Sequence, residues 1–112
     1  MMTVVELPEY LRRAKKLLQE EERDHLVNYL ASHPTAGVIL EGTGGIRKLR
    51  WKREGMGKRG GVRVIYYYHN EEYPVFLLTL FGKSEQANIS HAERNVLSKM
   101  IHDLLASYDR PL

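Results

Sequence analysis

The middle of the chain, residues 46–81, reads IRKLRWK, REGMGKRGG, VRVIYYY, HNEEYP and VFLLTLF. The runs 46–52, 62–68 and 75–81 are rich in apolar, β-branched and aromatic residues, and glycine-rich or polar segments separate them. This pattern is typical of strands joined by turns. The last run is apolar on both faces, as expected for a strand inside a sheet. These features predict an antiparallel meander of three strands.

Helical periodicity appears on both sides of this meander. Apolar residues recur at helical spacing over residues 8–18 and 26–30, with a charged joint between them at 19–22. This predicts either one bent helix or an antiparallel hairpin of two helices, the hairpin being favoured if the chain breaks near Gln19. Residues 90–93 form a capping-box pattern ahead of a C-terminal helix, and residues 3–7 predict an edge strand. The fold class predicted is α+β.

Length and composition set limits on the class of protein. The chain has 112 residues, which predicts a single domain over residues 1–112. It has no cysteine, which excludes disulfides, thiolate nucleophiles and cysteine zinc sites. Its longest apolar run is far shorter than a bilayer span, and its first residues do not resemble a signal peptide. We therefore expect a cytoplasmic protein without a membrane partner.

Positive charge is concentrated in one part of the sequence. Residues 44–63 contain eight lysines and arginines against one acid, Glu54, a local charge of +7 in a chain whose total is +3. The remaining residues therefore sum to −4. Such a concentration favours an anionic partner, either nucleic acid or an acidic protein segment. A solvated basic loop is the alternative.

The basic residues alternate with apolar ones along residues 46–52. Leu49 and Trp51 fall on one face of the predicted strand, and the basic residues of 48–52 fall on the other. A basic residue on the next strand, Arg63, can converge with them, and so can residues 58 and 59 of the glycine-rich loop. Such a cluster binds phosphates. The strand aromatics either stack on unpaired bases or pack in the core, and core packing is the more common outcome.

A cluster of this kind also suits cleavage of RNA by its own 2′-hydroxyl. That reaction needs a group that accepts the hydroxyl proton, cations that hold the charge on the phosphoryl oxygens, and a group that protonates the leaving oxygen. Arginine and lysine supply the charge, and a lysine crowded by other cations can act as acid or base without a metal. The five histidines lack the spacing of a zinc motif. Among them His69, which follows the tyrosine-rich strand, is the best placed to carry a proton.

Residues 42–50 (GTGGIRKLR), 57–67 (GKRGGVRVIYY) and 77–85 (LLTLFGKSE) resemble, in this order, the RelE/HigB family of toxins from type II toxin–antitoxin modules, and most of all its HigB subgroup. The resemblance implies an N-terminal helical pair, a curved antiparallel sheet of three to four strands and a C-terminal helix. It implies an endoribonuclease that enters the ribosomal A site and cuts mRNA there. It also implies a cognate antitoxin, through which alone the toxin would reach operator DNA.

The resemblance also implies site residues. The basic pair that flanks one apolar residue before the loop corresponds to Lys48 and Arg50, the arginine of the next strand to Arg63, and the basic residue after the third strand to Lys83. Many relatives have an arginine next and a tyrosine soon after, whereas this chain has Ser84 and no tyrosine before Tyr108. The general base would then be one of the two lysines, or His69 or a strand tyrosine in their place. We expect further RNA contacts, and no cofactor or metal, at a surface formed by Arg47, Lys52, Lys58 and Arg59.

Two other functions fit the same residues. The missing arginine and tyrosine also fit a non-catalytic module that binds RNA or the ribosome. The concentrated charge alone fits a protein-interaction module whose basic face docks an acidic partner. The ribonuclease hypothesis is favoured over both mainly by the family resemblance.

Overall fold

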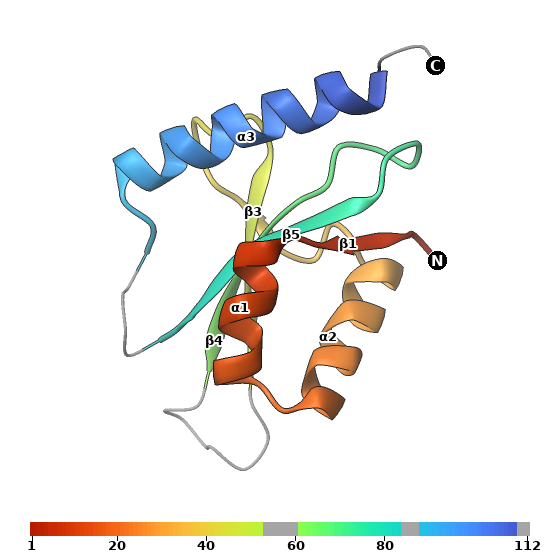
Figure 1. Cartoon of the computed structure of the whole chain (residues 1–112), viewed down its shortest axis with the longest axis vertical. Coiled ribbons are helices and arrows are strands. Elements are labelled where there is room, and N and C mark those ends of the chain that lie inside the picture. The colour runs from red at the N-terminus through yellow and green to blue at the C-terminus, as the bar shows by residue number, and fades with distance from the viewer. Residues whose placement is uncertain (53–60, 84–87, 110–112) are drawn as a thin grey trace.

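The computed structural model describes residues 1–52, 61–83 and 88–109. A five-stranded sheet separates a helical hairpin on one face from a single helix on the other (Figure 1). The elements are, in chain order, β1 (Val4–Glu6), α1 (Pro8–Leu17), α2 (Glu20–Ser32), β2 (Val38–Ile39), β3 (Ile46–Trp51), β4 (Val62–Tyr67), β5 (Val75–Gly82) and α3 (His91–Asp109).

The strand order in the sheet is β1-β5-β4-β3-β2. The predicted meander is confirmed, since β3, β4 and β5 pair antiparallel with their sequence neighbours. The predicted edge strand is confirmed as β1, but it pairs parallel with β5, so the sheet is mixed and has five strands rather than three to four antiparallel ones. The sequence pattern missed β2 because two residues are too few to show alternation.

The first third of the chain is a hairpin of two helices, as the break near Gln19 predicted (Figure 1). Pro8 occupies the first turn of α1, where its missing N–H costs nothing. Leu18 leaves the helical conformation with φ −128° and ψ 146°, which ends α1. The Gln19 backbone N–H donates a hydrogen bond of 3.1 Å to the Glu22 carboxylate, which helps to start α2.

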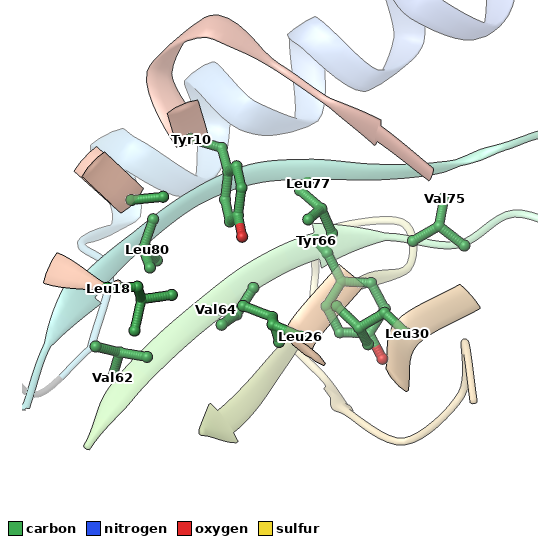
Figure 2. Packing of buried hydrophobic residues seen from close by; sticks show 11 residues of the cluster. Tyr10, Leu18, Leu26, Leu30, Val62, Val64, Tyr66, Val75, Leu77 and Leu80 are labelled. Carbon is green, nitrogen blue, oxygen red and sulfur yellow. The ribbon is translucent and has the colours of Figure 1, made fainter. Parts of the chain in front are cut away.

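The hairpin buries its apolar face against one side of the sheet (Figure 2). Tyr10 of α1 and Leu26 and Leu30 of α2 are fully buried there, together with Val64 and Leu77 from the strands. Neighbouring residues of β5 point to the other side, into a second cluster beneath α3. The prediction that residues 75–81 form an interior strand, apolar on both faces, is therefore confirmed.

Tyr66 connects this core to the segment between α2 and β2. Its hydroxyl donates to the Pro34 carbonyl and accepts from the Gly37 N–H, both at 2.8 Å. A Cβ on Gly37 would lie 2.8 Å from the Tyr66 ring, so only glycine allows this approach.

Replacing Tyr66 with phenylalanine is expected to lower the free energy of unfolding by about 1–3 kcal/mol, because the buried Gly37 N–H and the Pro34 carbonyl each lose their partner. Urea unfolding of both proteins measures the difference. Tyr108→Phe is the control, because Tyr108 is half exposed. Equal unfolding midpoints for Tyr66→Phe and the wild type would contradict this prediction.

The C-terminal helix α3 begins with the predicted capping box. The Ser90 N–H donates to the Glu93 carboxylate at 3.0 Å, and the Glu93 N–H donates to the Ser90 hydroxyl at 3.1 Å. Ser98 of α3 donates to the Thr43 carbonyl in the turn before β3, at 3.3 Å. At the other end of α3, Tyr108 contacts Phe76 at the start of β5, with ring centroids 5.6 Å apart. α3 thus lies across the end of the sheet where β3 begins and β4 ends (Figure 1).

Candidate functional site

The strand register places two arginines directly beside each other. Arg50 of β3 pairs with Arg63 of β4, and Arg63 pairs in turn with Phe81 of β5. Directly opposite residues of an antiparallel pair project from the same face, with Cα atoms about 4.5–5.5 Å apart. This face is the one that α3 partly covers, because Phe81 belongs to the cluster beneath α3.

Lys48 lies on the same face, two residues before Arg50 along β3. It pairs with the buried Ile65 on one side and with Val38 of β2 on the other. On its other side Ile65 pairs with Thr79 of β5, so Lys48, Ile65 and Thr79 form one row across the sheet. Thr79 is partly exposed. The basic side chains therefore stand over an otherwise uncharged strip of the sheet. We call the surface formed by Lys48, Arg50, Arg63 and Lys83 the basic face.

Backbone pairing with Gly61 places Lys83 at the basic face. Its backbone N–H donates to the Gly61 carbonyl at 3.0 Å, which continues the β4–β5 ladder one residue beyond Gly82. The Arg63 guanidinium leans toward the same place, because Nη1 lies 3.5 Å from where a Cβ on Gly61 would be. Arg63 and Lys83 therefore both lie beside Gly61, at the end of the sheet away from the C-terminal end of α3. Lys83 is exposed there, as is Lys52, which directly follows β3.

The positive charge of the basic face is not neutralised within the described part of the chain. None of its four residues forms an ion pair with a described carboxylate, although such pairs occur elsewhere, at Arg12–Glu9 and Arg23–Glu6. Like charges directly opposite on neighbouring strands destabilise a sheet. A bound anion would remove this repulsion, so the arrangement favours the anion-bound state.

Replacing Arg50 with glutamine is expected to stabilise the free protein at low salt by about 0.2–1 kcal/mol, because it removes the repulsion between Arg50 and Arg63. The gain should vanish in 1 M salt, where the screening length is only about 3 Å. Thermal unfolding over a salt series measures both effects. A variant less stable than wild type at every salt concentration would show that no repulsion exists.

One described residue predicted for RNA binding, Arg47, does not join the basic face. Arg47 projects from the opposite face of β3, where Nη1 donates to the Thr35 carbonyl at 3.2 Å and to the Gly37 carbonyl at 2.8 Å. Strand alternation forces this placement, since Arg47 lies one residue from Lys48. The predicted contacts of Lys58 and Arg59 lie outside the described residues, as does Ser84.

The aromatic side chains of the strands pack against other residues of the protein and do not lie on the basic face. Trp51 projects toward the helical hairpin and contacts Tyr29, with ring centroids 5.5 Å apart. Tyr66 is fully buried on that side. On the α3 side, the Tyr67 hydroxyl pairs with His69 Nδ1 at 3.0 Å. Core packing, the alternative to base stacking, is therefore what the structure has for Trp51 and Tyr66.

The same placements narrow the choice of proton-transfer groups. Arg63 and Tyr67 lie near opposite ends of β4, about 13 Å apart for four residues of strand, and His69 lies beyond Tyr67. Burial raises the pKa of Tyr66 and of Tyr67, so both hydroxyls stay protonated. The structure therefore brings neither His69 nor a strand tyrosine to the basic face, and the groups able to transfer a proton there are its lysines, Lys48 and Lys83.

Sequence reasoning missed two features around the basic face. Thr79 on β5 lies in the row of Lys48, and only the register reveals it. The first helix carries four cations, Arg12, Arg13, Lys15 and Lys16. They lie outside residues 44–63, the segment in which the positive charge was counted. Among the described residues, no three His, Cys, Asp or Glu side chains are grouped so as to hold a metal ion. None of the described helices combines the length and apolarity needed to span a bilayer.

The fold and the basic face define a small α+β domain that presents a strip of converging cations on a sheet, a class of surface suited to nucleic acid. The family described as the RelE toxin of the RelE/RelB toxin–antitoxin system matches residues 10–112. The chain therefore belongs to the RelE toxin family, and it is a toxin of a toxin–antitoxin system, which implies a cognate antitoxin.

A solved structure supports the fold. It is a mutant of the E. coli toxin RelE in which two arginines are replaced by alanine, in the free state. The two chains superpose with a TM-score of 0.55 and are 18% identical, over 77% of this chain and 87% of the other. At this identity the likeness concerns the fold alone, and it confirms the α+β architecture that was predicted.

Proposed function

We propose that this chain is an endoribonuclease that enters the ribosomal A site, cuts mRNA and so stops translation in the cytoplasm. The observation that carries the proposal is the direct pairing of Arg50 with Arg63 on the face that holds Lys48. Two guanidinium groups side by side suit the oxygens of one phosphate. The cognate antitoxin silences the enzyme, and operator DNA is contacted only through the antitoxin complex. Membership of the HigB subgroup stays a prediction.

In the proposed reaction the 2′-oxygen of a nucleotide attacks the adjacent phosphorus and the bond to the 5′-oxygen of the next nucleotide breaks. Arg50 and Arg63 hold the non-bridging oxygens, where negative charge increases. Lys48 and Lys83 are the candidates to accept the proton of the 2′-hydroxyl and to donate one to the leaving 5′-oxygen. The products are a 2′,3′-cyclic phosphate and a 5′-hydroxyl, so atoms and charge balance without a metal or cofactor.

Other basic residues are proposed to hold the RNA on either side of the cut. Lys52 is exposed two residues after Arg50, and Lys58 and Arg59 follow it in sequence. We leave Arg47 out of this set, because its guanidinium is engaged by backbone carbonyls on the other face.

The test is induction of the chain in growing cells with mapping of mRNA 5′ ends. We expect new ends within translated messages, and their loss with Lys48→Gln and with Lys83→Gln. Purified toxin acting on ribosomes that carry mRNA should leave a 2′,3′-cyclic phosphate on the upstream fragment and a 5′-hydroxyl on the downstream fragment. Fragments with a 3′-hydroxyl and a 5′-phosphate, the products of attack by water instead of the 2′-hydroxyl, would contradict the metal-independent reaction.

The second candidate function is a non-catalytic module that binds RNA or the ribosome, and Ser84 in place of the expected arginine favours it. The same experiment separates the two, because a binder arrests growth without creating new ends. A module that only docks an acidic protein would bind ribosomes no better than a neutral protein does across a salt series. Either result would overturn the proposed ribonuclease.

A further inference from the structure

The exposed side of α1 is a second cationic surface. Tyr10 and Ala14 are fully buried and face the sheet, whereas Arg12, Lys15 and Lys16 are exposed on the other side of the helix. The helix carries a single acid, Glu9, which forms an ion pair with Arg12 at 2.8 Å. The four cations of α1 therefore exceed its acids by three.

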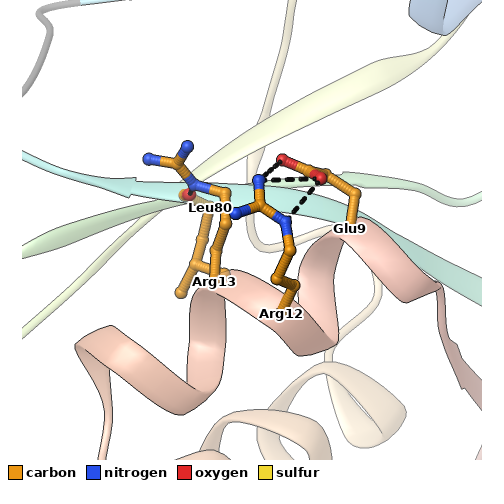
Figure 3. Close-up of polar contacts among 4 residues, drawn as sticks. All are labelled: Glu9, Arg12, Arg13 and Leu80. Atoms are coloured by element: carbon orange, nitrogen blue, oxygen red, sulfur yellow. Dashed lines mark hydrogen bonds and ion pairs between the residues drawn. The ribbon is translucent and has the colours of Figure 1, made fainter.

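Arg13 attaches this surface to the edge of the sheet (Figure 3). Its Nε donates to the Leu80 carbonyl of β5 at 2.5 Å. That carbonyl is accessible because β1 pairs only with residues 75–77, which leaves the second half of β5 without a strand on this side. Leu80 directly precedes Phe81, the residue opposite Arg63. α1 therefore lies on one face of the sheet and the basic face on the other, both beside the second half of β5.

A hollow of about 160 Å³ lies on this surface, lined by Arg12, Arg13, Lys16 and Leu17. Lys83 follows Leu80 by three residues, roughly 10 Å along an extended chain. The hollow therefore lies close enough to the basic face for one flexible polyanion to contact both. Lys16 is exposed at its rim, whereas Lys15, also exposed and in the same turn of α1, does not line it.

We propose that the α1 hollow binds a phosphodiester group of the RNA, and that Lys16 and Arg12 extend the basic face around the edge of β5. This inference rests on the proposed function, since it concerns the same RNA. Charge complementarity favours RNA, because the hollow continues a surface already suited to phosphates. An acidic protein segment is the competing occupant, and the phosphate belongs either to the message or to ribosomal RNA.

The test compares Lys16→Gln with Lys15→Gln, two variants with the same loss of charge from the same turn of α1. Binding to a short single-stranded RNA and to ribosomes is measured for each over a salt series. Losing one phosphate contact should weaken binding roughly fivefold at 0.1 M salt and reduce the salt slope by about 0.7. We expect this for Lys16→Gln on at least one of the two targets, with Lys15→Gln close to wild type.

A loss on the short RNA assigns the phosphate to the message, and a loss on ribosomes alone assigns it to ribosomal RNA. Equal binding by the two variants on both targets would overturn the inference. The inference would also be overturned if Lys16→Gln bound the antitoxin more weakly but bound both the short RNA and ribosomes as the wild type does. The proposed function fails by a different result, the absence of new mRNA ends with the wild-type chain, so the two failures are distinguishable.

Discussion

Replacing Arg63 with alanine is expected to reduce mRNA cleavage by about 10²–10³-fold, the usual effect of removing one group that stabilises charge in the transition state. Arg63 lies between Arg50 and Phe81 in the sheet and leans toward Gly61, and its loss leaves Arg50 as the single guanidinium of the basic face. The variant should keep its fold, because the side chain is only partly buried and its loss removes a repulsion.

Single-turnover cleavage on ribosomes carrying mRNA measures this effect, with circular dichroism to verify the fold. Lys99→Ala is the matched control, because it removes the same charge from an exposed position of α3. A folded Arg63→Ala that cuts at the wild-type rate would remove Arg63 from the site. Equal losses in Arg63→Ala and Lys99→Ala would show that only net charge matters.

Replacing Leu77 with alanine is expected to lower the free energy of unfolding by about 2–5 kcal/mol. Leu77 is fully buried where β5 meets the helical hairpin, and β5 is the strand that pairs with β4 beneath the basic face. A cavity there removes packing that holds α1 against the sheet. For a domain of this size, such a loss is a large share of the total stability.

Urea unfolding followed by tryptophan fluorescence measures the loss, because Trp51 belongs to the same cluster. Val96→Ala is the control, because Val96 is 68% exposed and its truncation should change stability by less than about 0.5 kcal/mol. Leu77→Ala should keep the wild-type cleavage rate per folded molecule. Similar stability losses in the two variants would contradict the burial of Leu77 in the core.

The elements could be predicted because their signals are local. The alternation of residues 46–52, the hairpin turn before Val75 and the capping box at Ser90 each depend on neighbours in sequence. The parallel pairing of β1 with β5 joins residues about seventy positions apart, and no local pattern reports such a contact. For this reason the fold class and the antiparallel meander were predictable, whereas the number of strands and the direction of β1 were not.

The basic face was predicted in part. Lys48, Arg50 and Arg63 could be assigned to one surface because strand alternation and an antiparallel neighbour leave little freedom. Arg47 was predicted for the same surface, but it projects from the other face of β3, where backbone carbonyls accept from its guanidinium. The α1 cations were visible as charges, but their closeness to the site depends on Arg13 reaching Leu80 across the chain.

The amino-acid sequence by itself determined the helices and every strand except β2, where the positive charge is concentrated and which family the chain resembles. Hydrogen bonding and side-chain periodicity act over a few residues, so one chain is enough to reveal them. Only the tertiary structure decided that Arg50 stands opposite Arg63, that Arg47 faces away and that α1 adjoins the edge of β5. These contacts depend on the register between distant strands, where a shift of one residue moves every side chain to the other face.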